Sequence, residues 1–222
     1  MSIVQKLNAV IDDRYIHSYS ESGNEYTILT ENQKDSTCKD ITLRHQAMQR
    51  VLVLNIDLQS ATENIHPFFV EKEKENQTGT FAGLRKKVDY LIFCERKSKT
   101  NLGELETFVF AVELKSKSTT GWHRQVKAGH TFAQYLISFL HIRDGASLEL
   151  KKNKVIYRCI LFNSKASAEG ANSYEKKGKN SQRRKFAQRQ KDKKIYELYD
   201  EFDHQYCIRQ CGNTYQLKTF AC

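Results

Sequence analysis

KKVDYLIF (residues 86–93) and FVFAVELKSK (residues 108–117) are the two segments that decide the fold of this chain. The second contains five consecutive apolar residues, Phe108 to Val112, without alternation, which is typical of a strand covered on both faces. Residues 123–140 (HRQVKAGHTFAQYLISFL) then place apolar side chains at helical spacing on two faces. The pattern predicts two central strands followed by a buried helix.

Charged side chains stand where these apolar runs begin or end. Asp89 is the only acid within residues 88–93, and Glu113 and Lys115 come at the end of the second run. Because side chains alternate along a strand, Glu113 and Lys115 share one face, while Leu114 points into the core. A carboxylate in a buried strand is costly unless it meets a cation or a hydrogen-bond donor. These acids therefore indicate a metal site.

The segment between the strands is polar and contains Asn101 and Gly103, as expected for a hairpin loop. The two strands are therefore predicted to be antiparallel neighbours, which would bring Asp89 toward Glu113. Two carboxylates and a backbone carbonyl offer the hard oxygen ligands that Mg²⁺ prefers. A lysine beside them would stabilise charge on a phosphate and favour deprotonation of a water molecule. This chemistry suits phosphodiester hydrolysis.

The order D-x23-E-x-K, with each acid on its own apolar strand and a helix behind, resembles the PD-(D/E)XK nuclease superfamily. The matching residues are Asp89, Glu113 and Lys115. Gln125, near the start of the helix, falls where several branches of that superfamily have a glutamine that contacts the site or the substrate. The resemblance covers roughly residues 84–163. The chain departs from the pattern directly before Asp89, where it has valine instead of the name-giving proline.

The resemblance implies an α/β fold in which helices flank a central mixed sheet, with a restriction-endonuclease-like core. It implies a metal-dependent nuclease, with DNA favoured over RNA as substrate, in which Asp89, Glu113, Lys115 and Gln125 are catalytic. Asp89, Glu113 and the carbonyl of Leu114 would hold Mg²⁺ or Mn²⁺. If the enzyme cuts both strands of a duplex, a homodimer or a larger complex is expected.

An upstream acid often completes the metal site in this superfamily, and Glu25, Glu63 and Glu71 all stay open as candidates. Two other interpretations also stay open. Glu113 and Lys115 could form an ordinary ion pair at a sheet edge, with Asp89 capping a turn. The chain could also keep the nuclease fold without a working site, and bind nucleic acid or serve as a subunit of a larger complex.

The positive charge of the chain is concentrated late in the sequence. The 222 residues have a net charge of +10, and residues 164–194 contain eleven Lys or Arg against three acids, a net charge of +8. Such a block commonly contacts nucleic-acid phosphates, although a solvated segment is the alternative. We refer to residues 164–194 as the basic arm. Its predicted phosphate contacts are Lys176, Lys177, Lys179, Arg183, Arg184, Lys185 and Arg189.

Composition predicts a single domain over residues 1–222. Hydrophobic residues make up 39% and charged residues 28% of the chain, as in a globular protein. No apolar stretch is long enough for a membrane span, and no secretion signal opens the chain, so a cytoplasmic protein without a membrane partner is expected. The six cysteines are scattered, which predicts reduced thiols.

The remaining segments follow from their periodicity. Helices are predicted over residues 3–19 and 185–202. Residues 41–58 fit either a helix through about residue 54 or a helix followed by a short strand around residues 51–56, and the second interpretation is preferred. Residues 154–163 predict a strand parallel to 108–117. Residues 26–29 predict a short strand, and residues 204–220 a closing hairpin around Gly212.

Overall fold

The structure is a computed structural model. It describes residues 1–31, 36–38, 40–56, 88–98, 103–115, 122–143, 154–163, 196–199 and 205–221. Several predictions therefore lie outside the described residues: the basic arm with its seven predicted phosphate contacts, and the candidate acids Glu63 and Glu71.

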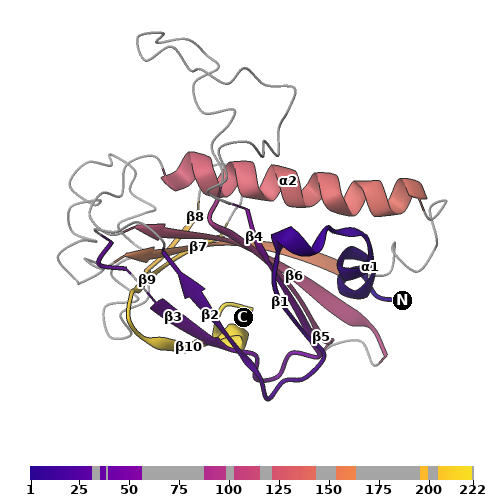
Figure 1. The fold of residues 1–222 in the computed structure, drawn as a ribbon, viewed down its shortest axis with the longest axis horizontal. Helices are drawn as coiled ribbons and strands as arrows, with labels where there is room; N and C mark the ends of the chain where they lie inside the picture. The colour runs from indigo at the N-terminus through magenta and orange to yellow at the C-terminus, as the bar shows by residue number, and fades with distance from the viewer. Residues whose placement is uncertain are drawn as a thin grey trace, which may run out of the picture.

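Two β-sheets form most of the described chain (Figure 1). The large sheet has seven strands in the order β1-β4-β5-β6-β7-β9-β8, and the small sheet has three in the order β10-β3-β2. The strands of the large sheet are β1 (Ile16–Ser20), β4 (Arg50–Asn55), β5 (Tyr90–Lys97), β6 (Leu105–Lys115), β7 (Lys154–Asn163), β8 (Tyr196–Tyr199) and β9 (Gln205–Gln210). Those of the small sheet are β2 (Tyr26–Thr30), β3 (Asp40–Arg44) and β10 (Thr214–Gln216).

Helices and the small sheet cover opposite faces of the large sheet (Figure 1). The helices are α1 (Ile3–Val10) and α2 (Trp122–Arg143), with short 3-10 turns at Asp13–Tyr15 and Leu217–Thr219. Leu91, Val109 and Ala111 pack toward the helices, whereas Phe108, Phe110 and Val112 pack toward the small sheet. A strand covered on both faces needs continuous apolar sequence, which is the pattern of residues 108–112.

The predicted arrangement of the three central segments is confirmed. β5 and β6 are antiparallel neighbours, and β7 pairs with β6 in parallel after α2 crosses between them. The expectation of an α/β fold with a mixed central sheet is confirmed with them. The second apolar face of α2, predicted from Phe132, Leu136 and Phe139, is buried only in part, because Phe132 and Leu136 pack partly buried against the core whereas Phe139 is 52% exposed.

Two helix predictions in the first 60 residues are corrected. α1 ends at Val10, and residues 16–20 form β1 instead of continuing the helix. The helix predicted from residue 41 is wrong, because this segment forms β3 and β4, although the strand expected near residues 51–56 is confirmed. Both β3 and β4 pair with other strands along their length, and this pairing outweighs helical spacing over such short segments.

The C-terminal predictions are also corrected. Residues 196–199, expected within a helix, form the edge strand β8. The closing hairpin is wrong as well, because β9 pairs with β7 and β8 in the large sheet while β10 pairs with β3 in the small sheet. The turn at Gly212, where φ is +78°, thus passes the chain from one sheet to the other.

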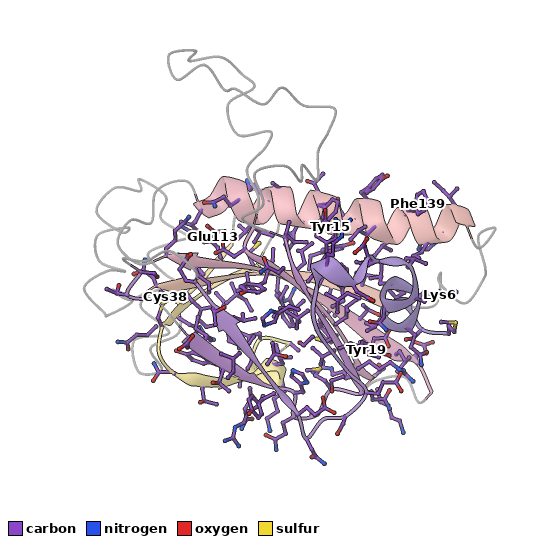
Figure 2. The ribbon with its side chains drawn as sticks, viewed as in Figure 1. Lys6, Tyr15, Tyr19, Cys38, Glu113 and Phe139 are labelled. Atoms are coloured by element: carbon purple, nitrogen blue, oxygen red, sulfur yellow. A yellow bond between two sulfur atoms is a disulfide. The ribbon has the colours of Figure 1, made fainter. Side chains whose placement is uncertain are left out.

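The expectation of reduced thiols is wrong for one pair of cysteines. Cys38 and Cys211 form a disulfide across a sequence separation of 173 residues. Cys38 lies two residues before β3 and Cys211 directly follows β9, so the bond joins the two sheets (Figure 2 labels Cys38). Cys94, Cys159 and Cys207 are buried thiols.

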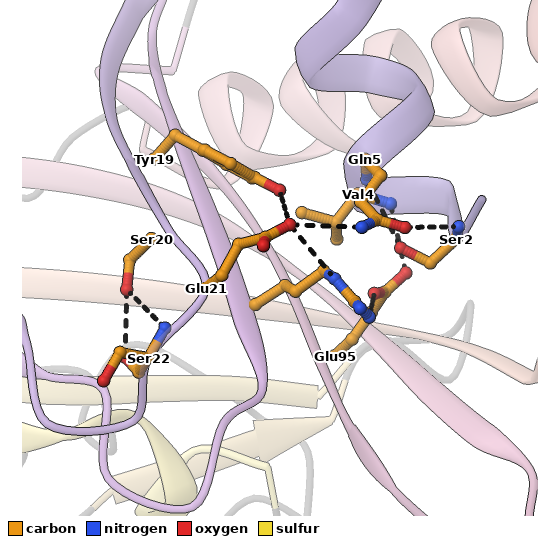
Figure 3. Close-up of polar contacts among 9 residues, drawn as sticks. Ser2, Val4, Gln5, Tyr19, Ser20, Glu21, Ser22 and Glu95 are labelled. Atoms are coloured by element: carbon orange, nitrogen blue, oxygen red, sulfur yellow. Dashed lines mark hydrogen bonds and ion pairs between the residues drawn. The ribbon is translucent and has the colours of Figure 1, made fainter.

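A buried carboxylate anchors the start of α1 to the large sheet (Figure 3). Glu95 of β5 is fully buried, accepts a 3.0 Å hydrogen bond from the backbone N–H of Val4, and lies 3.5 Å from the guanidinium of Arg50. Arg50 also lies 3.5 Å from Glu21, which accepts a hydrogen bond from Gln5 of α1. The negative charge at the helix N-terminus is favourable.

Among the described residues, no helix has both the length and the apolar character needed to cross a membrane.

Candidate active site

Asp89 and Glu113 meet at the ends of adjacent strands. The antiparallel ladder ends with Tyr90 of β5 opposite Val112 of β6, and Asp89 and Glu113, the next residues on the two segments, lie close enough to interact electrostatically. Ala111 packs toward α2, and side chains two residues apart point to the same face. The two carboxylates therefore share the helix-covered side of the sheet.

The contacts of this pair join both strands. The Asp89 carboxylate accepts a 2.5 Å hydrogen bond from the backbone N–H of Leu114. The Lys115 ammonium lies 2.5 Å from Oε1 of Glu113. Leu114 itself points to the opposite face and is buried, as predicted. The structure thus brings the side chains of Asp89, Glu113 and Lys115, and the backbone of Leu114, to one end of the sheet.

Burial raises the pKa of the Glu113 carboxyl to about 9, and the negative charge of Asp89 adds to the effect, while Lys115 opposes it. Glu113 is 0% exposed, whereas the Lys115 side chain is 25% exposed. Within the described residues, the Lys115 ammonium at 2.5 Å and a backbone hydrogen bond from Asp89 favour the charged form of Glu113, but burial outweighs them. A buried carboxyl group whose pKa is raised in this way is biased toward either protonation or a bound cation.

Gln125 lies over the same end of the sheet. α2 packs closely at Gly129, where an added Cβ would lie 2.6 Å from Cγ1 of Val88 and 3.3 Å from Cβ of Ala111. Gln125 is one helical turn earlier, about 6 Å back along α2. Glu113 is two residues beyond Ala111, about 7 Å along β6. Because α2 returns antiparallel to β6 before the parallel strand β7, these two displacements point the same way. Figure 2 shows Glu113 near one end of α2 and Phe139 toward the other.

The structure adds Asn163, a residue that sequence reasoning did not identify as part of the site. It is the last residue of β7, stands opposite Lys115 in the parallel ladder, and is 2% exposed. Leu161 of the same strand packs toward the helices, so Asn163 faces that side as well. A polar residue that directly ends an apolar strand is the same signal that singled out Glu113, and it could have identified Asn163.

The position of Glu25 does not suit an upstream acid that would complete the metal site. Glu25 precedes β2 in the small sheet, which covers the face of the large sheet opposite the helices. It is therefore separated from Asp89 and Glu113 by the thickness of the large sheet. Within the described ranges, no group of three or more His, Cys, Asp or Glu side chains is placed to hold a metal ion. The two carboxylates and the Leu114 carbonyl remain the oxygen donors of this site.

Comparison of the chain with models of protein families, with curated proteins and with solved structures found no match.

Proposed function

We propose that this chain is a metal-dependent nuclease that hydrolyses phosphodiester bonds in nucleic acid, most favourably DNA, on a restriction-endonuclease-like core. One observation carries the proposal. Asp89 and Glu113 lie opposite each other at the ends of two central strands, on one face, with Lys115 paired to Glu113. Stability alone does not account for this arrangement, since two neighbouring acids at a buried position oppose folding.

A divalent cation fits the donors present. Glu113 is fully buried beside the negative charge of Asp89, with the Lys115 ammonium as a cationic contact, and carboxylate and carbonyl oxygens are the ligands that Mg²⁺ prefers. Asp89, Glu113 and the carbonyl of Leu114 would hold Mg²⁺, or Mn²⁺ in its place. When bound, the ion would supply a water of lowered pKa and charge stabilisation on the phosphate.

Lys115 and Gln125 serve the substrate in this proposal. The ammonium of Lys115 neutralises Glu113 and is partly exposed, so it can also donate to a phosphate oxygen on which charge develops. Gln125 lies in the first turn of α2 and orients substrate or water through its carboxamide. The positive end of the α2 dipole favours a phosphate near the same place.

The charge of the chain supports a polyanionic substrate. The net charge is +10, and most of it belongs to the basic arm. Binding that rests on phosphate contacts weakens steeply as salt rises, because counterions are released.

Cleavage of a panel of single- and double-stranded DNA and RNA, with Mg²⁺, with Mn²⁺ and with EDTA, tests the proposal. Asp89→Asn, Glu113→Gln and Lys115→Ala should each abolish metal-dependent cleavage. Glu106→Gln is the matched control. Glu106 also lies on β6, but it forms a 3.0 Å ion pair with Arg96 at the other end of the strand.

The outcomes separate the proposal from its alternative. Activity that requires the metal and disappears in the three site variants alone supports a nuclease. If the wild type cleaves nothing, gains no stability from Mg²⁺ or Mn²⁺, and still binds nucleic acid in a salt-sensitive way, the chain is a binding protein or a subunit of a complex on the same fold.

A further inference from the structure

The outer face of the small sheet contains a hollow of about 840 Å³. β2, β3 and β10 form its floor, and the turns next to them form its rim. Leu29, Ile41 and Leu43 point the other way, into the core between the sheets. The hollow therefore faces away from the large sheet. Its volume is within the range of about 300–1,000 Å³ that is usual for small-ligand clefts.

Three side chains cross this hollow in one row. Gln216 of β10 stands opposite Arg44 of β3, and Arg44 stands opposite Tyr26 of β2. Ile28 and Thr42 form the next row on the same face. Neighbouring side chains in a row come from adjacent strands, which lie about 4.8 Å apart.

The two rows expose more apolar surface than folding requires. Tyr26, at the start of β2, is 63% exposed, and Ile28, in the middle of β2, is 41% exposed. Two large apolar side chains on a concave polar surface are typical of a binding face and add nothing to the core.

The side chains match the chemistry of an unpaired nucleotide. The ring of Tyr26 offers a face on which a base can stack, and the guanidinium of Arg44 can stack or pair with a phosphate. The carboxamides of Asn24, Gln46 and Gln216 line the same hollow and can donate to and accept from base edges. An open sheet surface admits a single strand, whose bases are available, but not the stacked bases of a duplex.

We propose that this hollow binds unpaired nucleotides of a single-stranded nucleic acid, with a base stacked on Tyr26 and its backbone or a second base against Arg44. The carboxylate of Glu25 also lines the hollow and offsets the charge of Arg44, so the long-range attraction for a polyanion comes from the net charge of +10 of the whole chain. The hollow and the pair Asp89–Glu113 lie on opposite sides of the large sheet. This binding therefore goes beyond the nuclease proposal and does not depend on a working metal site.

Fluorescence anisotropy with labelled oligo-dT and oligo-U, and with a blunt duplex of equal length, tests the proposal in EDTA, where metal-dependent cleavage is absent. Tyr26→Ala should weaken single-strand binding about tenfold, which corresponds to the loss of one stacked base, with little effect on the duplex. Arg44→Gln should reduce the salt dependence by about one ion. Tyr135→Ala is the matched control, because Tyr135 is 61% exposed but lies on α2.

Photocrosslinking with oligonucleotides that contain 5-iodouracil then locates the contact. Crosslinks to β2, β3 or β10 that disappear in Tyr26→Ala support the proposal. It is overturned if the wild type has no single-strand affinity, if Tyr26→Ala binds like Tyr135→Ala, or if all crosslinks map elsewhere. Since every measurement uses metal-free protein, these outcomes are independent of whether the chain cleaves nucleic acid.

Discussion

Glu113 should make the metal-free protein less stable as the pH rises from 7 to 8.5. Its carboxyl has a pKa of about 9 in the folded chain, against an ordinary value of 4.5. Between these values the folded state binds a proton that the unfolded state has lost, so the free energy of unfolding falls with pH by about 1.4 kcal/mol per unit. Over this range the expected loss is about 2 kcal/mol.

This pH range avoids the other buried groups with a shifted pKa. Burial lowers the pKa of His45 below its ordinary 6.5, so its effect on stability ends below pH 7. Burial raises the pKa of the Cys94 thiol, and its effect begins only as the unfolded thiol ionises near pH 9. Urea unfolding in EDTA can be followed by Trp122, the single tryptophan, which is fully buried.

The decisive comparison is between the wild type and Glu113→Gln, a neutral side chain of the same shape. The variant should lose the decrease between pH 7 and 8.5, whereas the control Glu106→Gln should keep it. Equal slopes in the wild type and Glu113→Gln would refute the reasoning. A metal must displace the proton of Glu113, so stabilisation of the wild type by Mg²⁺ should increase with pH and be absent in Glu113→Gln.

Three further predictions concern the elements that position the site. Gly129→Ala should lower the free energy of unfolding by about 1 kcal/mol, because overpacking costs about 1–3 kcal/mol and the better helix former returns up to about 1 kcal/mol. Thermal unfolding should show a smaller loss from the same change in a Val88→Ala background, and an equal loss would contradict a clash. Reducing the bond between Cys38 and Cys211 should cost about 2–4 kcal/mol, since it closes a long loop. Dithiothreitol should lower the melting temperature of the wild type but not of Cys38→Ser. An unchanged melting temperature of the wild type in dithiothreitol would contradict the disulfide. Glu95→Ala should cost about 3 kcal/mol in urea unfolding, because it leaves the partly buried guanidinium of Arg50 and a helix amide without this carboxylate. Glu95→Gln can still accept from the amide and should lose less, so equal losses would argue against this role.

The sequence by itself was sufficient for the centre of the molecule. Continuous apolar runs predicted β5, β6 and β7 because a strand covered on both faces cannot tolerate alternation. The polar loop between β5 and β6 predicted their antiparallel pairing, and the pairing placed Asp89 beside Glu113. These features are local, or depend on segments close in sequence, so a pattern of residue types is enough to specify them.

Only the tertiary structure decided the periphery. β3 and β10 are short, and their state depends on partners far away in the sequence: Leu43 pairs with Tyr215, and Cys38 bonds to Cys211. Strand formation in such segments is set by the neighbouring strand more than by intrinsic preference. The same holds for the site, where the neighbourhood of Lys115 and Asn163 exists only because β6 and β7 align in parallel. Sequence spacing predicts which side chains share a strand face, but the register between distant strands is a property of the folded core.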